Sequence, residues 1–207
     1  MTKIQGGVAS ARLTRADVID AALQALAERG LEGLSTRAVA DRLGVRMNTV
    51  LWHVKTKARM LELMADAVLA GVRYENLPSA PHERVGELAG RYRQALLAHR
   101  DGAALVTGTY PAEPHTLRFA DCLIDALLQA GADEKQATWT VWTVSYFTLG
   151  LTQEEQAAPG QADERLTPAV HSGAYPALER VLPHLGPGSF EDRFDFGLHA
   201  ILSTLPK

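Results

Sequence analysis

Cationic and hydrogen-bonding side chains gather between residues 37 and 57. They are Arg37, Arg46, Asn48, Thr49, His53, Lys55 and Lys57, and Met47 lies among them. Lysine and arginine neutralise phosphates, and an asparagine amide can bind adenine through two hydrogen bonds in the major groove. Methionine offers only an apolar contact, for example to a thymine methyl group. The set predicts a surface for double-stranded DNA, although Met47 and Asn48 also fit a solvated turn.

The same stretch has the pattern of two short helices joined by a tight turn. Ser35 or Thr36 can cap the first helix, and Gly44 suits the positive φ angle of a turn between helices. In the second helix, from residue 47 to 54, the candidate buried positions are Val50, Trp52 and Val54. This pattern predicts a helix-turn-helix that can enter a major groove, and an ordinary pair of surface helices is the alternative.

Charge is distributed unevenly along the chain. Residues 1–60 contain ten lysines and arginines against five acidic residues, a balance of +5. The remaining residues contain eleven bases and nineteen acids, a balance of −8, which the net charge of −3 conceals. Only the first part is therefore suited to a polyanion such as DNA.

The composition is that of a globular protein with a full core. Of the 207 residues, 46% are hydrophobic and 22% are charged. Cys122 is the single cysteine and no export signal precedes Leu13, so we expect a cytoplasmic protein without disulfides. Residues 136–153 are uncharged over nearly the length of a bilayer, but threonines on one face favour a buried helix over a membrane span.

Helical periodicity continues along the whole chain, and no strand pattern is present. We expect a first helix capped by Thr14 and ended by Gly30, and a fourth helix from Thr56 to about Tyr74. Further helices are expected over residues 83–100, 101–106, 114–130, 134–157, 175–185 and from Ser189 onward. The composition of residues 159–168 predicts a mobile loop. The fold class is therefore all-α, with a DNA-binding domain over residues 1–57 and an all-helical domain over residues 58–207.

An aromatic stripe runs along the expected helix 134–157. It consists of Trp139, Trp142 and Tyr146, followed by Leu149. Such a stripe can line a pocket for an organic ligand or can simply pack in the core. Gly150 and Gly197 lie in the two helices with the most apolar character, where a glycine permits close helix approach or is merely tolerated.

The chain resembles the TetR family of bacterial repressors, in its tetracycline-repressor-like branch. The resemblance covers roughly Leu13 to Leu205. It is carried by four segments in the family's order: Gly33-Leu34-Ser35-Thr36-Arg37 with Leu43-Gly44-Val45; Trp52-His53-Val54-Lys55 with Lys57; residues 95–103; and Phe147-Thr148-Leu149-Gly150. Gly108-Thr109 followed by Pro111 is a further match.

The resemblance implies a homodimer with one helix-turn-helix per subunit. The helix 134–157 and the last helix would form most of a four-helix interface. The two DNA-binding domains would read half-sites of a near-palindrome about 34 Å apart, and a ligand would release the DNA through the fourth helix.

The resemblance also assigns roles in the DNA-binding domain. Arg37 and Thr49 match family positions that contact the operator, and Lys57 matches a lysine that contacts phosphate. The reading helix departs from the tetracycline repressor at Met47, Asn48 and Leu51, which replace Gln, Pro and Tyr. We therefore expect a different operator sequence.

The expected ligand pocket departs further from the family. Val106 replaces the histidine that binds magnesium, Arg73 replaces a ligand-binding histidine, and Leu88 replaces an asparagine. Valine cannot coordinate a cation, so we expect an organic ligand without metal or cofactor. The pocket residues predicted in this way are Arg73, Leu88, Tyr92, Val106, Thr109, Trp139, Trp142, Tyr146 and Glu154, with Arg73 available to pair with an acidic group.

Two functional classes remain after other chemistry is considered. His99-Arg100-Asp101 copies the start of a kinase catalytic loop without the rest of a kinase, and the histidines are too scattered to bind zinc. We therefore predict no enzyme. The first class is a repressor released by a small molecule, and the second is a DNA-binding regulator whose helical domain docks another protein.

Overall fold

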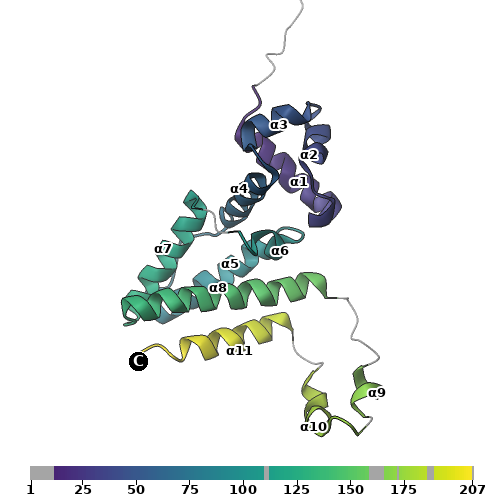
Figure 1. The fold of residues 1–207 in the computed structure, drawn as a ribbon. Helices are drawn as coiled ribbons and strands as arrows, with labels where there is room; N and C mark the ends of the chain where they lie inside the picture. Colours follow the sequence, from purple (N-terminus) through teal and green to yellow (C-terminus); the bar gives the residue numbers. More distant parts are fainter. Residues whose placement is uncertain (1–11, 110–111, 159–165, 172, 186–188, 207) are drawn as a thin grey trace, which may run out of the picture.

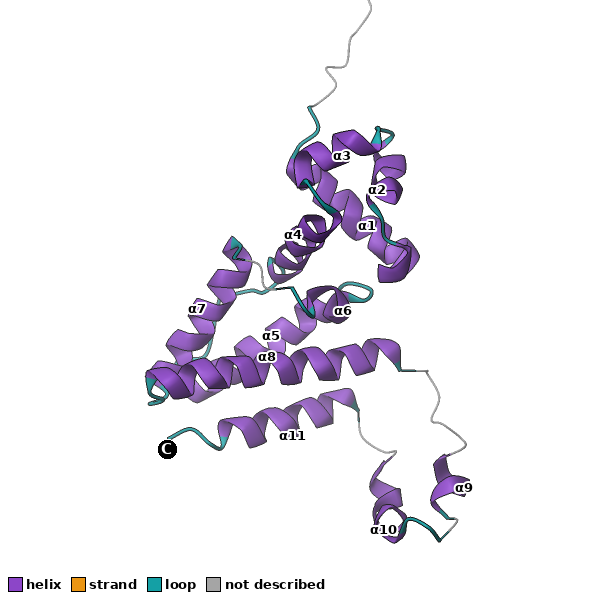
Figure 2. Ribbon diagram, viewed as in Figure 1, coloured by secondary structure: helices purple, strands orange, loops and turns teal. Residues whose placement is uncertain are grey.

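The structure is a computed structural model that describes residues 12–109, 112–158, 166–171, 173–185 and 189–206. These residues form helices joined by turns, without a strand among them (Figure 2), which confirms the predicted all-α class. The helices are α1 (Arg15–Gly33), α2 (Thr36–Leu43), α3 (Met47–Val54), α4 (Lys57–Leu69), α5 (Pro81–Leu97), α6 (Gly102–Val106), α7 (Pro114–Gln129), α8 (Glu134–Ala157), α9 (Leu166–Val170), α10 (Pro176–Leu185) and α11 (Phe190–Leu202).

Helices α1, α2 and α3 form a small head at one end of the molecule (Figure 1). The Thr14 side chain caps α1 in a capping box with Asp17, and the Ser35 hydroxyl accepts the Ala38 N–H at the start of α2. Gly44 ends α2 in the left-handed region at φ 66°, as predicted. The core of the head contains Val18, Leu26, Val39, Val50 and Val54, all fully buried.

The prediction that Trp52 is buried is wrong. Its side chain is 63% exposed, whereas Val50 and Val54 are fully buried. Residues four apart share a helix face, so Val50 and Val54 define the inner face of α3. A residue two positions from each of them, such as Trp52, must point outward.

Helix ends differ from the prediction in α1, α4 and α5, and α5 ends at Leu97 rather than at residue 100. Helix α1 bends at Gly30, where φ is 70°, and continues to Gly33. The predicted extension of the fourth helix to Tyr74 is wrong because α4 ends at Leu69. Beyond it, the carbonyl groups of Arg73 and Glu75 accept hydrogen bonds from the Arg91 side chain, so they take no part in a helical ladder.

The bend in α1 also contacts the rest of the molecule. The Leu31 N–H donates to Oδ2 of Asp101 at 2.8 Å, and Arg100 donates to the carbonyl groups of Ala27 and Glu28. A side chain at position 30 would be strained, because φ is positive there and a Cβ atom would lie 2.9 Å from Oδ2 of Asp101. The head is therefore joined to the body by this contact as well as by α4.

Helices α5 to α8 and α11 form the body, and α4 packs against both α1 and the body. Leu88, Leu96, Leu123, Leu127 and Met64 are among its largest fully buried side chains. Helix α11 lies alongside α8 on the outside of the body (Figure 1). A capping box between Ser189 and Asp192 begins α11, as the sequence predicts.

Helices α9 and α10 pack against each other and lie apart from the body in Figure 1. The predicted loop 159–168 is partly wrong because α9 begins at Leu166, and residues 159–165 lie outside the described part of the chain. Pro183 does not interrupt α10, which continues to Leu185. Among the described residues, no helix combines the length and hydropathy needed to cross a bilayer.

Candidate DNA-binding surface and effector cavity

The start of α3 presents the predicted base-contacting residues to solvent. Arg46 precedes the helix, Met47 is its first residue with 45% of its side chain exposed, and Asn48 is also exposed. Thr49 is half-buried one position further on. Side chains at the start of a recognition helix are those that reach base edges when the helix enters a major groove.

A second group of predicted contacts lies where α3 meets α4. Lys55 has a positive φ of 66° and turns the chain, so that Thr56 caps α4 and Lys57 begins it. The N-terminus of a helix offers unpaired N–H groups and a positive dipole to a phosphate. His53 is half-buried, and its ring lies edge-on to Trp52 with ring centroids 4.7 Å apart.

Trp52 is a candidate contact residue that the sequence interpretation missed. It projects from α3 into solvent, and Nζ of Lys55 lies 5.9 Å from the centroid of its ring. The signal was present in its spacing from Val50 and Val54. An exposed aromatic ring next to a cation gives this end of α3 an apolar surface that can pack against the sugar-phosphate backbone.

The cations of this region fall into two groups. Arg37, Arg46, Lys55 and Lys57 form no ion pair among the described residues. Arg42, in contrast, pairs with Glu28 of α1 at 2.6 Å and donates to Gln24 at 2.9 Å. Arg42 therefore holds α2 to α1, and the first group is available to phosphates.

The body contains a cavity of about 590 Å³. Its wall is built by residues of α4 to α8 and, between α6 and α7, by Thr107, Gly108, Thr109 and Ala112. Five predicted ligand residues line it: Tyr92, Val106, Thr109, Trp142 and Tyr146. The sequence interpretation did not identify the remaining large apolar members, which are Leu69, Leu117, Phe119, Ile124, Val141 and Leu149.

Aromatic pairs and hydroxyl groups give the cavity its chemical character. The rings of Tyr92 and Phe119 stack with centroids 4.6 Å apart, and those of Trp142 and Tyr146 stack at 5.6 Å. The hydrogen-bonding groups in the wall belong to threonines, Ser145, Gln153, the two tyrosines and Trp142, and no charged residue or histidine is among the described lining residues. Burial raises the pKa of the Tyr92 phenol, which is therefore neutral.

Four predicted ligand residues lie outside this cavity. Leu88 is fully buried in the core, and Glu154 is exposed near the end of α8. Trp139 is 65% exposed, with Nζ of Lys135 4.8 Å from the centroid of its ring. Thr138, Val141, Ser145 and Leu149 define the face of α8 toward the cavity, and Trp139 points away from that face.

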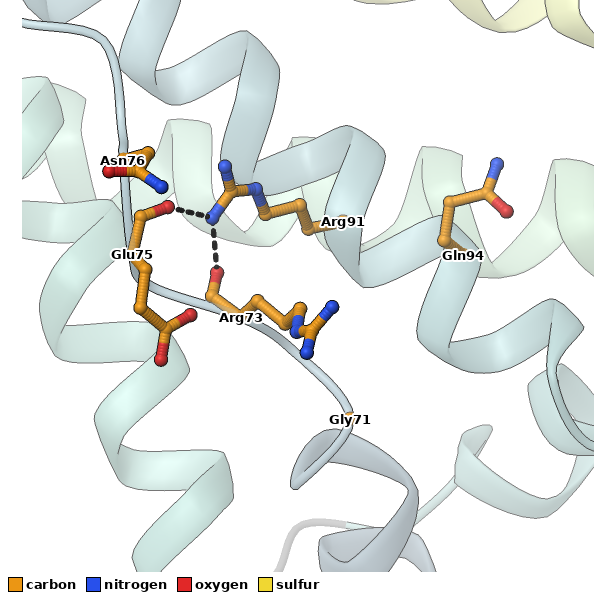
Figure 3. Close-up of a pocket in the computed structure, with 6 residues that line it drawn as sticks. All are labelled: Gly71, Arg73, Glu75, Asn76, Arg91 and Gln94. Atoms are coloured by element: carbon orange, nitrogen blue, oxygen red, sulfur yellow. Dashed lines mark hydrogen bonds between the residues drawn. The ribbon is translucent and has the colours of Figure 1, made fainter.

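Arg73, the fourth of these residues, lines a separate hollow after α4 (Figure 3). Arg91 also lines this hollow, and its Nη1 donates to the carbonyl oxygens of Arg73 and Glu75 at 2.8 Å each. Its Nε donates to Glu87 at 2.6 Å. The Arg91 side chain, paired with Glu87, therefore holds the segment between α4 and α5 in place. Arg73 is not placed to pair with a ligand in the cavity.

A buried arginine ties three helices of the body together. Arg93 of α5 is 2% exposed and pairs with Glu155 of α8 at 2.8 Å and with Glu191 of α11. The guanidinium carbon lies 5.3 Å from the ring centroid of Phe194. These contacts fix α8 and α11 against the cavity-bearing helices, and we assign Arg93 a structural role.

A helix-turn-helix head with free cations, joined by α4 to a helical body with an apolar cavity, defines a helix-turn-helix transcriptional regulator. Residues 18–64 match the family model for bacterial regulatory proteins of the tetR family, and residues 77–207 match the model for the tetracyclin repressor-like C-terminal domain. The chain belongs to the TetR family of transcriptional regulators.

Relatives of known identity agree with this assignment. The class A tetracycline repressor from transposon 1721 of Escherichia coli is 36% identical over 193 residues, which cover 92% of this chain and 89% of the relative. A possible TetR family regulator from Streptomyces coelicolor A3(2) is 37% identical, with a TM-score of 0.80 over 91% of this chain and 97% of that one. ActR from Streptomyces coelicolor in complex with actinorhodin is 26% identical, with a TM-score of 0.84 over 93% of this chain and 96% of that one.

Proposed function

We propose that this regulator is a homodimeric repressor that leaves its operator when an uncharged organic molecule occupies the body cavity. The observation that carries the proposal is the cavity of about 590 Å³, whose described wall contains aromatic and hydroxyl side chains without a formal charge. Cavities of this size and polarity are typical of small-molecule sites. In domain terms, residues 1–57 bind DNA, and residues 58–207 bind the ligand and the second subunit.

The outer surface of α8 and α11 supports the homodimer. Trp139 of α8 is 65% exposed and Phe196 of α11 is 79% exposed, and the two helices lie side by side. Large aromatic side chains on adjacent helices are costly to leave in water and are typical of a protein interface. A twofold axis between two such surfaces joins four helices and brings the two heads to the same side.

The heads would then read two half-sites in successive major grooves. Asn48 reads adenine, Met47 packs against a base methyl group, and Arg37 and Lys57 bind phosphates. Because Met47 and Asn48 replace residues of the tetracycline repressor, the operator has a different sequence. Trp52 adds an apolar contact beside Lys55.

The cavity also indicates the kind of effector. Val106 stands in the wall where the tetracycline repressor has a metal-binding histidine, so a chelated magnesium complex has no protein ligand at this position. The stacked pairs Tyr92–Phe119 and Trp142–Tyr146 favour a flat aromatic molecule. A charged group on that molecule would be buried without a partner, which disfavours it strongly.

Selection of operator fragments from random duplex DNA, followed by gel-shift titration, tests the proposal. Neutral N-phenyl-1-naphthylamine should weaken operator binding at least fivefold, whereas its sulfonated relative 1-anilinonaphthalene-8-sulfonate should not. Ala120→Trp fills the cavity and should abolish binding of the neutral probe, and Arg73→Ala, at an exposed residue outside the cavity, should preserve it. A wild-type protein that binds its operator but retains it with every neutral aromatic compound would favour the alternative of a protein-docking body.

A further inference from the structure

Helix α4 is fastened to the start of α7 by a hydrogen-bonded carboxylate. Oδ1 of Asp66, on α4, accepts the Thr116 N–H at 2.8 Å and the Thr116 hydroxyl at 2.9 Å. Thr116 is the third residue of α7, so its N–H has no partner within that helix. Asp66 is 7% exposed and lies at the positive end of the α7 dipole, which stabilises a carboxylate there.

A second contact joins the same two helices closer to the head. Nη2 of Arg59 donates to Oε1 of Glu113 at 2.5 Å, and its Nη1 donates to Glu62 at 2.9 Å. Glu113 is the residue that precedes α7, and Arg59 lies seven positions before Asp66 on the same face of α4. Arg59 is also two residues from Lys57, one of the phosphate contacts assigned above.

The start of α7 forms part of the cavity wall at the same time. Ala112, Thr116, Leu117 and Ala120 all line the cavity. Thr116 therefore contacts both Asp66 and the cavity, and Glu113 lies between two lining residues, Ala112 and Thr116. A ligand that displaces this segment must move or break both contacts with α4.

We infer that the Asp66–Thr116 and Arg59–Glu113 contacts form a latch through which occupancy of the cavity is passed to α4 and the head. Asp66, Arg59 and Glu113 are positioning residues in this scheme, because they act on the head through α4 and do not line the cavity themselves. The inference rests on the proposed function, since it describes how the effector weakens DNA binding. Its physical basis is that the latch has different contact energies in the empty and occupied states.

The latch is tested by measuring effector coupling with the full-length protein. Asp66→Ala, Glu113→Ala and the double variant are compared with Glu62→Ala, which removes the Arg59 contact within α4 but leaves the contact to α7. The affinity for N-phenyl-1-naphthylamine is measured by fluorescence, and the affinity for the selected operator is measured with and without saturating probe. Thermal unfolding verifies that each variant is folded.

The double variant should bind probe and operator separately within about threefold of wild type, while the probe-induced loss of operator affinity falls below about twofold. Glu62→Ala should respond like wild type. A double variant that binds the probe and releases DNA as wild type does would overturn the latch while leaving the proposed function intact. If the double variant is unfolded, the same criterion applies to the two single variants.

A wild-type protein that fails to respond to the probe would count against the proposed function. In that case the latch is tested with a side chain introduced into the cavity by mutation. Ala120→Phe places a ring in the cavity beside the start of α7. It should weaken operator binding in the protein with an intact latch and have little effect in the double variant. Equal weakening in both backgrounds, or no weakening in either, would overturn the inference.

Discussion

Gly197 of α11 lies directly against the ring of Phe147 of α8. A Cβ atom at position 197 would lie 2.2 Å from Cζ and 2.5 Å from Cε2 of that ring. The Phe147 ring also stacks on Phe194, with centroids 5.9 Å apart. Of the two interpretations that the sequence leaves open for Gly197, the structure therefore supports close approach of the two helices. At Gly150, the other glycine considered, a Cβ atom would meet nothing within 4 Å.

Gly197→Ala should destabilise the protein despite the higher helix propensity of alanine. Overpacking typically costs about 1–3 kcal/mol, and the gain in propensity offsets roughly 1 kcal/mol of it. Urea unfolding should show a lower midpoint, and Phe147→Leu in the same chain should restore part of the loss. Gly150→Ala is the matched control and should be neutral or stabilising. Equal stability of Gly197→Ala and wild type would show that the ring can move aside freely.

Local rules explain what the sequence could predict about the fold. Ser35, Gly44 and the Ser189–Asp192 capping box are recognisable because a cap or a turn depends on residues within a few positions. The class of each major element follows from its periodicity. Trp52 was assigned wrongly because a short helix with five apolar residues in eight contains more than one possible inner face.

The site was harder to predict because its parts meet only in the folded chain. Large apolar side chains lie on more than one face of α8, so periodicity could not distinguish Trp142, in the cavity wall, from Trp139, on the outer surface. Leu88 and Arg73 were taken from matching family positions, which preserve helix order but not the shape of the cavity. The contact between Asp66 and Thr116 spans 50 positions and leaves no local signal.

Stability should fall as the solution becomes mildly acidic, because of His99. Burial lowers the pKa of the His99 imidazole, so the folded protein favours its neutral form. In the unfolded chain a histidine titrates near a pKa of about 6.5. The stability it contributes is therefore complete above that pH and is lost as the pH falls through the lower pKa of the folded state.

Urea midpoints measured from pH 7.5 to pH 5 should reveal this loss, and His99→Gln should reduce the dependence. His171→Gln, at an exposed histidine in the turn that follows α9, serves as the control and should leave the pH dependence unchanged. His99 follows α5, and its carbonyl accepts the Gly102 N–H and the Gln156 side-chain amide. A pH profile for His99→Gln identical to that of wild type would assign the acid sensitivity to other groups.

The salt dependence of operator binding separates cations that contact DNA from those that support the head. Each phosphate neutralised contributes about −0.9 to the slope of log affinity against log salt. Lys57→Ala removes one such contact per subunit, so the slope of a homodimer should become shallower by about 1.8. Arg42→Gln is the matched control, because Arg42 is already paired with Glu28 within the head, and its slope should equal that of wild type. An unchanged slope for Lys57→Ala would remove Lys57 from the DNA surface, whereas a shallower slope for Arg42→Gln would show that the Glu28 pair opens when DNA binds.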